Sequence, residues 1–133
     1  MHFSKSLIIA SFILILTVAV VSADETRLMR YPDIHGDQIV FTYGGDLWLV
    51  NSSGGRAIRL TTHIGSDAMA KFSPDGKKIA FIGRYDGDYY IYTIPIEGGV
   101  PTRITDHPLG EVILDWHPDG NKILFLSYRE SHQ

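Results

Sequence analysis

The segment Lys71–Phe81, which reads KFSPDGKKIAF, constrains the fold of this chain more than any other feature because it recurs. It reads as strand, tight turn and strand: Pro74 sets φ for the second position of a turn, and Gly76 tolerates positive φ. Asp115–Leu126, which reads DWHPDGNKILFL, repeats the pattern with its proline 44 residues further on. A degenerate earlier copy lies at Pro32–Phe41. The chain is therefore built from repeated hairpins.

The repeat extends beyond the turn, because several other residue pairs have the same spacing. The pairs 44 residues apart are Gly54-Gly55 and Gly98-Gly99, Leu60-Thr61 and Ile104-Thr105, His63 and His107, Trp48 and Tyr92, and Phe81 and Phe125. Self-similarity at a period of roughly 40–50 residues is typical of solenoids and propellers. Each unit offers four short extended runs and no helical periodicity, so the prediction is an all-β fold made of β-propeller blades.

The repeat predicts how the chain is organised. The units span about residues 28–66, 67–110 and 111–133, and the best copy has strands at about 68–73, 77–83, 89–94 and 100–104. Shorter runs at 39–43, 46–50, 57–61, 112–116 and 122–127 complete the pattern. Two and a half units fall short of the roughly four to eight blades of a propeller. We therefore expect residues 24–133 to be an incomplete propeller, from a truncated product or a fragment of a longer reading frame.

Residues 1–23 have the pattern of a helical secretory signal peptide. Lys5 supplies the positive start, and Leu7–Val21 is an apolar run interrupted by Ser11 and Thr17. Small residues at Val21-Ser22-Ala23 suit cleavage before Asp24. The alternative is an uncleaved anchor, for which 15 residues is short. The prediction is export to the periplasm or the extracellular space.

Composition excludes several functions. A net charge of −3 gives no basic footprint for nucleic acid, so no nucleic-acid partner is expected. The chain has no cysteine, which excludes disulfides and thiolate metal sites. Nothing in the pattern predicts a cofactor or a metal.

A catalytic site is not expected either. Ser66 beside Asp67, with His63 close in sequence, is the nearest imitation of a Ser-His-Asp arrangement, but no G-x-S-x-G motif is present. The serine is replaced by Gly110 in the next unit, so it is not a repeated feature. His63 matches His107 by repeat, and both are predicted to be structural residues of the turns between blades.

Other candidates have structural interpretations that we favour. His117 stands before the turn proline as a capping group, the 86–88 loop lacks the spacing of a calcium loop, and Lys77-Lys78 is a solvated pair. A cluster of aromatic residues offers either a surface for sugars or peptides or a wedge between blades, and we favour the wedge. These residues are Trp48, Tyr89, Tyr90, Tyr92 and Trp116.

The chain resembles the tricorn protease family from about Leu28 to Gln133. The opening Arg30–Ile34 (RYPDI) and Gly45–Trp48 (GDLW) are the more particular features, and Arg59–Thr61 and Phe72–Lys77 follow the same pattern. The resemblance implies a six-bladed N-terminal propeller followed by a second propeller, a PDZ domain and a serine-peptidase core. The family's nucleophile lies in that core, so the resemblance assigns no catalytic residue to this chain.

Together with the predicted signal peptide, the resemblance implies a non-catalytic propeller segment of a secreted tricorn-like serine peptidase, acting in proteolysis as scaffold and substrate filter and inactive alone. Its partners would be peptides or the missing C-terminal peptidase part, with a homo-oligomer as a further option. The family archetype is cytosolic, so the signal peptide is a departure. FSPDGKKIAF also occurs in TolB-like periplasmic propellers and in prolyl-oligopeptidase-type propellers. The alternative is therefore a TolB-like envelope propeller that binds a protein partner.

Overall fold

Ten β-strands in three antiparallel sheets make up the part of the chain that the computed structural model describes, residues 28–107 and 110–128. The predicted all-β fold is confirmed. The first sheet contains β1 (Arg30–His35), β2 (Gln38–Tyr43), β3 (Asp46–Asn51) and β4 (Ile58–Arg59); the second contains β5 (Asp67–Phe72), β6 (Lys78–Gly83), β7 (Tyr90–Pro95) and β8 (Thr102–Arg103); the third contains β9 (Glu111–Trp116) and β10 (Ile123–Ser127).

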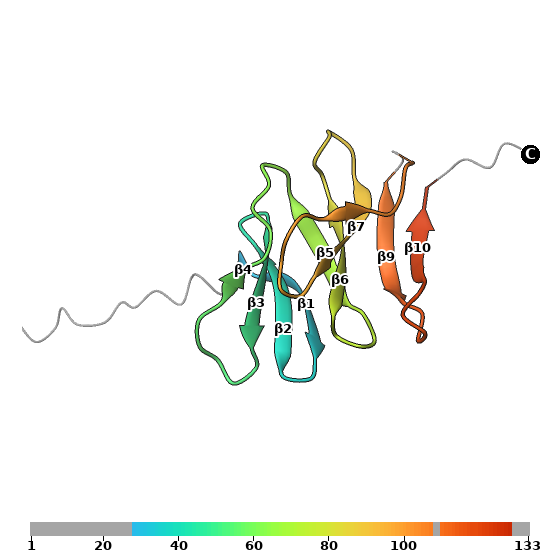
Figure 1. Ribbon diagram of the computed structural model, residues 1–133. Helices are drawn as coiled ribbons and strands as arrows, with labels where there is room; N and C mark the ends of the chain where they lie inside the picture. Colours follow the sequence, from blue (N-terminus) through green and yellow to red (C-terminus); the bar gives the residue numbers. More distant parts are fainter. Residues whose placement is uncertain (1–27, 108–109, 129–133) are drawn as a thin grey trace, which may run out of the picture.

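The sheets follow one another in chain order, with β4 and β10 at opposite ends of the molecule (Figure 1). Each sheet is a meander in which strands adjacent in sequence are paired. The first strands meet at the centre, since β1 contacts β5 and β5 contacts β9. The predicted strands are present to within one or two residues, except that β4 and β8 are only two residues long.

Loop length explains why the spacing between the first two units is not uniform. Phe41 pairs with Trp48 across the two-residue loop Gly44-Gly45, whereas Phe81 pairs with Tyr92 across the longer loop 84–89. The first two units are therefore 40 residues apart before this loop and 44 after it. The two glycines have φ of 61° and 88°, which a short hairpin loop requires and other residues resist.

The PDG turn has the predicted chemistry. The Ser73 hydroxyl donates to the Asp75 carboxylate at 2.7 Å and accepts from the amide N–H of Lys78 at 2.9 Å. The amide N–H of Gly76 donates to the Ser73 carbonyl at 2.8 Å. Side-chain and backbone hydrogen bonds therefore close the turn at several points, which fixes the register of the hairpin.

The degenerate first copy folds differently from its two successors. Pro32 and Asp33 do not form a turn but lie inside β1, at a point where the pairing with β2 shifts register. The turn is instead made by Gly36 and the residue after it, since His35 pairs with Gln38. The equivalence with the PDG turn was therefore wrong here, because the Pro-Asp pair fits an irregular edge strand as well as a turn.

Two apolar layers hold the three sheets together. Between the first two sheets lie buried residues of both: Val40, Leu47, Leu60, Ala70, Phe72, Ile79, Phe81, Tyr92 and Ile94. Between the second and third sheets lie Ala80, Ile82, Ile91 and Ile113, with Met69, Trp116, Ile123 and Phe125 packed against them. The second sheet is thus covered on both faces, so its strands have almost continuous apolar burial.

Polar contacts fix the sheets relative to one another. The Asp33 carboxylate in β1 accepts from the Phe72 amide N–H in β5 at 2.8 Å and from the Lys71 ammonium at 3.4 Å. The indole N–H of Trp116 in β9 donates to the Lys71 carbonyl at 3.0 Å. Each first strand is therefore hydrogen-bonded to the first strand of the next sheet through one side chain.

The predicted signal peptide, residues 1–23, lies outside the described residues. Among residues 28–107 and 110–128, no helix is long and apolar enough to cross a membrane. The division into residues 1–23 and 24–133 stays a prediction.

Candidate functional site

A cavity of about 680 Å³ lies where the first strands of the three sheets begin. Its wall includes Arg30 at the start of β1, Ala68 at the start of β5 and Val112 at the start of β9. Hairpin loops add Gly45 and Tyr89. Residues from all three sheets therefore line the cavity, which lies on the side of the sheets opposite the PDG turns.

Strained backbone borders this cavity. Tyr31 and Met69 both line it and have φ of 52° and 55°, in the left-handed region that non-glycine residues seldom adopt. Each lies at a β-bulge, because the register shifts between Arg30 and Asp33 in β1 and between Ala68 and Lys71 in β5. Bulges turn side chains away from the regular alternation, and strain of this kind concentrates at functional sites. Sequence reasoning missed both bulges, since nothing in the residue types marks them.

Two buried carboxylates stand at the cavity edge, at equivalent places in the repeat. Asp67 begins β5 and Glu111 begins β9, 44 residues later, with exposed fractions of 1% and 4%. The hydroxyl of Thr105 donates to the Glu111 carboxylate and accepts from the Ile91 amide N–H at 3.0 Å. Each acid is thus placed where the last strand of one sheet crosses to the first strand of the next.

Asp67 has the less complete hydrogen bonding of the two acids. Thr61 accepts from the Leu47 amide N–H at 2.9 Å, as its repeat partner does from Ile91. Both oxygens of Asp67 are buried without a hydrogen-bond partner of normal geometry among the described residues, although the Thr61 and Tyr85 hydroxyls lie close enough to lower its pKa. Burial outweighs them and raises the pKa of Asp67 to about 6. Its carboxyl therefore titrates close to neutral pH.

The Ser66, Asp67 and His63 group does not have the geometry of a catalytic triad. The Nδ1 atom of His63 accepts from the Gly65 amide N–H at 3.2 Å, and its ring packs 4.2 Å from that of Tyr85. The backbone carbonyl of Ser66 accepts a hydrogen bond from the Arg84 amide N–H at 3.0 Å. That no residue of this chain is catalytic stays a prediction.

The aromatic residues do not form one binding surface. Tyr92 is buried and stacks on Phe81 with ring centroids 5.8 Å apart, and Trp116 lies between two sheets. The Arg103 guanidinium lies over the Tyr90 ring, with its Cζ atom 4.9 Å from the ring centroid. Of the five aromatic residues singled out from the sequence, Tyr89 alone lines the cavity. The wedge interpretation therefore holds for Tyr92 and Trp116.

The remaining candidates lie apart from the cavity. Asp119 donates its amide N–H to Nδ1 of His117 at 3.3 Å, which agrees with the predicted capping role. In the 86–88 loop, the Gly87 carbonyl accepts from Arg84 at 2.8 Å. His107 has a buried Nδ1 with no hydrogen-bond partner among the described residues. Within residues 28–107 and 110–128, no group of three or more His, Cys, Asp or Glu is arranged to hold a metal ion.

Meandering antiparallel sheets that pack face to face, with their first strands meeting at the centre, are the blades of a β-propeller. The model of the tricorn protease N-terminal beta propeller domain matches residues 26–133. The chain belongs to this family.

Curated relatives support the assignment over part of the chain. The tricorn protease homolog of Saccharolobus solfataricus is 39% identical over 67 residues, which cover 46% of this chain and 6% of the relative. The tricorn protease of Thermoplasma acidophilum is 41% identical over 54 residues, which cover 41% of this chain and 5% of the relative. The putative tricorn-like protease N-terminal subunit of Sulfurisphaera tokodaii is 39% identical over 67 residues, which cover 46% of this chain and 34% of the relative. The chain therefore spans a small fraction of the length of the relatives it matches.

Solved structures give the same fold. The crystal structure of the tricorn protease has a TM-score of 0.63 and 30% identity, covering 74% of this chain and 10% of that one. The structure of putative TolB from Agrobacterium tumefaciens has a TM-score of 0.64 and 28% identity, and the match covers 70% of this chain and 35% of the TolB chain. This chain is thus similar to propellers of both kinds.

Proposed function

We propose that residues 24–133 form a non-catalytic propeller segment of an exported tricorn-like serine peptidase, where the segment acts as a scaffold and filters peptides. The observation that carries the proposal is the cavity of about 680 Å³ at the meeting point of three blades. Its wall is mainly apolar, with side chains such as Leu28, Met69 and Val112, and its volume falls in the range of ligand sites. An open cavity of this kind suits short peptide segments.

The proposal assigns the chemistry to another part of the enzyme. The curated relatives are far longer than the matched segment, which supports a partner region beyond the propeller. Peptides and that peptidase region are the proposed partners. Reading the gene beyond the codon for Gln133 is the direct check, because a tricorn-like enzyme requires a downstream PDZ domain and peptidase core.

Narrowing the cavity tests the filter. Ala68 lines the cavity, and Ala68→Phe adds a ring there. In the complete peptidase, this change is expected to slow the hydrolysis of long peptides several-fold and to leave a minimal fluorogenic substrate unaffected. Ile64→Phe is the control, because Ile64 is fully exposed and does not line this cavity. Equal rates for the two variants on long peptides would argue against a filter.

A second candidate is supported by the likeness to TolB structures, whose TM-scores of 0.64 and 0.65 are close to the 0.63 of the tricorn protease. In that case the propeller would bind a protein partner and no peptidase core would follow. The same reading of the gene separates the two candidates, because the TolB-like chain would end soon after its propeller.

Export is a separate part of the proposal. The apolar run Leu7–Val21 and the small residues before Asp24 support cleavage by a signal peptidase. Mass spectrometry of the protein from the periplasmic or extracellular fraction is expected to find an N-terminus at Asp24. Recovery of the chain in the membrane with Met1 retained would contradict it.

A further inference from the structure

The loop between β6 and β7 differs from its counterpart in the first sheet, at the edge of the cavity. In the first sheet, β2 and β3 are joined by Gly44 and Gly45, which line the cavity without side chains. In the second sheet, the corresponding loop spans residues 84–89, and Tyr89 at its end lines the cavity. Both sheets have four paired strands, so the comparison is between two four-stranded blades. The longer loop therefore adds an aromatic side chain to one blade's part of the cavity wall.

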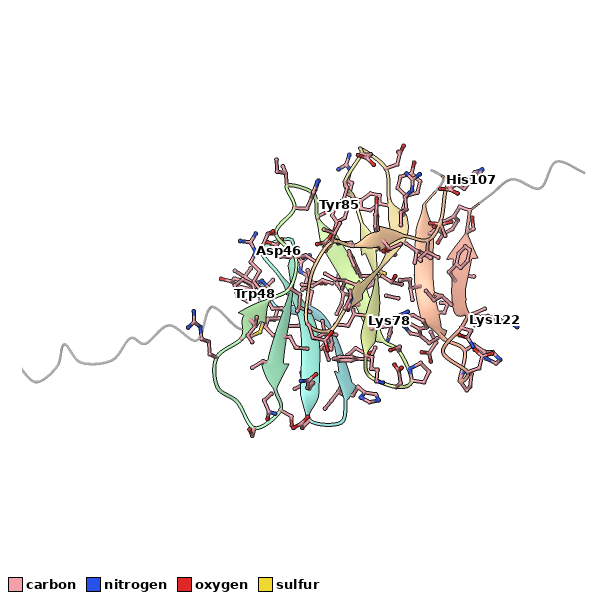
Figure 2. The ribbon with its side chains drawn as sticks, in the orientation of Figure 1. Asp46, Trp48, Lys78, Tyr85, His107 and Lys122 are labelled. Atoms are coloured by element: carbon pink, nitrogen blue, oxygen red, sulfur yellow. The ribbon has the colours of Figure 1, made fainter. Side chains whose placement is uncertain are left out.

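Tyr85 anchors the long loop to the core between the first two sheets. Its ring centroid lies 4.2 Å from that of His63 and 4.6 Å from that of Tyr92, and its side chain packs against the buried residues of both sheets. Figure 2 shows Tyr85 at the end of the sheets opposite Lys78, which begins β6 just after a PDG turn. An aromatic contact with the core thus holds the loop on the side of the cavity.

Backbone and guanidinium contacts fix the loop further. The Arg84 amide N–H donates to the Ser66 carbonyl at 3.0 Å, and a Cβ added at Gly65 would overlap the Arg84 carbonyl. The Arg84 guanidinium donates to the Gly87 carbonyl at 2.8 Å, and its Cζ atom lies 5.4 Å from the centroid of the Tyr89 ring. Tyr89 therefore has a defined position although it is 44% exposed. A side chain held in place before the ligand arrives loses little conformational freedom on binding.

The inner strands of the first two sheets add groups that suit the same kind of ligand. Tyr31 lines the cavity, is 45% exposed and lies at the bulge of β1. Met69 lines it at the corresponding bulge of β5. Tyrosine rings and a methionine sulfur both make favourable contacts with aromatic rings, beyond the gain from apolar burial. This part of the wall therefore favours an aromatic side chain over a small one.

We propose that the 84–89 loop determines which peptides the cavity binds, with Tyr89 and Tyr31 contacting an aromatic side chain of the peptide. Gly65 and Tyr85 are positioning residues, because they act through the loop and do not line the cavity. The inference rests on the proposed function in that peptides enter the cavity. It adds the class of peptide, an extended segment that contains phenylalanine or tyrosine.

Two fluorescent peptides that differ at one position test the preference. One has phenylalanine at its centre where the other has alanine. Binding is measured by fluorescence anisotropy on the complete protein, after a fluorophosphonate has blocked any serine-peptidase turnover. The expected result is about tenfold tighter binding of the phenylalanine peptide, because ring contacts add to the burial of a larger side chain. Equal affinities, or no binding of either peptide, would overturn the proposal.

Variants assign the preference to the loop. Tyr89→Ala is expected to reduce it to about twofold, because the remaining wall still buries the larger side chain, whereas Tyr89→Phe keeps the ring and the preference. Gly65→Ala displaces the loop without changing a lining residue, so it is expected to reduce the preference as Tyr89→Ala does. Ile64→Ala is the matched control, since it removes an exposed apolar side chain outside the cavity and is expected to change nothing.

Each variant can contradict the proposal. A full preference in Tyr89→Ala, or an equal loss in Ile64→Ala, would overturn the role of Tyr89. A full preference in Gly65→Ala would overturn the positioning role of the loop contacts, with near-ultraviolet circular dichroism used to check that the variant keeps its aromatic packing.

The result is separable from the test of the filter. If Ala68→Phe slows the hydrolysis of long peptides while the two fluorescent peptides bind equally, the filter stands and the aromatic preference is wrong. If the phenylalanine peptide binds with the expected preference and Ala68→Phe leaves hydrolysis unchanged, the cavity binds aromatic peptides and does not filter substrates.

Discussion

At the scale of single residues, the least expected feature is the pair of buried acids at the crossovers between blades. Both Asp67 and Glu111 follow a threonine six residues earlier, and both lie at the start of a first strand. A buried carboxylate is costly unless hydrogen bonds or charges satisfy it. The repeat made the equivalence of the two positions visible in the sequence, but burial depends on tertiary packing, which residue types alone do not give.

The raised pKa of Asp67 predicts a stability that falls as pH rises. Its pKa is about 6 in the folded protein against an ordinary value of 3.8, so the folded state holds the proton more tightly than the unfolded chain. This contribution to the free energy of unfolding is complete below pH 3.8 and is lost as pH rises through 6, a change of about 3 kcal/mol. Asp67→Asn removes the titration, so the variant is expected to gain stability relative to the unchanged chain between pH 4.5 and 7.5.

Urea unfolding at the two pH values measures this difference. Other titrating groups affect both proteins alike, and only the difference between them reports on Asp67. If the difference is the same at both pH values, Asp67 does not titrate in this range.

At the scale of strands and turns, the sequence predicts most of the architecture. The hairpins around Gly44-Gly45 and Pro74-Asp75-Gly76 have turn residues whose dihedral preferences act locally, so their strands are placed to within one or two residues. Pro32 misled the prediction because a proline also fits an edge strand. The bulges at Tyr31 and Met69 were not predictable, since they arise where first strands pack together and not from any local preference.

The repeat equivalence of Phe81 and Phe125 does not extend to their burial. Phe81 is fully buried between two sheets, whereas Phe125 is only partly buried in the third. Sequence alone predicts equal costs for truncating them. From the structure, Phe81→Ala is expected to lower the free energy of unfolding by about 3–5 kcal/mol and Phe125→Ala by about 1–2 kcal/mol. Urea unfolding of both variants checks this, and equal losses would mean that the third sheet is as well covered as the second.

At the scale of the whole molecule, stability is distributed unevenly because the sheets do not have equal numbers of neighbours. The second sheet is covered on both faces, and Ile79, Phe81 and Ile91 in β6 and β7 are 0% exposed. The third sheet has two strands in the described residues and one exposed apolar face. In repeat architectures each unit is stabilised mainly by its neighbours. The candidate cavity spans all three sheets, so its wall joins regions of different local stability.

This distribution predicts the order in which backbone amides exchange with solvent. Amides of β6 and β7 are expected to exchange slowest, because opening them requires separating both apolar layers. Amides of β10 are expected to exchange fastest among the strands longer than two residues, since that strand has one neighbour and a free edge in the described residues. Hydrogen exchange followed by mass spectrometry measures both. Equal protection of β6 and β10 would contradict the uneven stability, because it would require the third sheet to open only with the rest of the molecule.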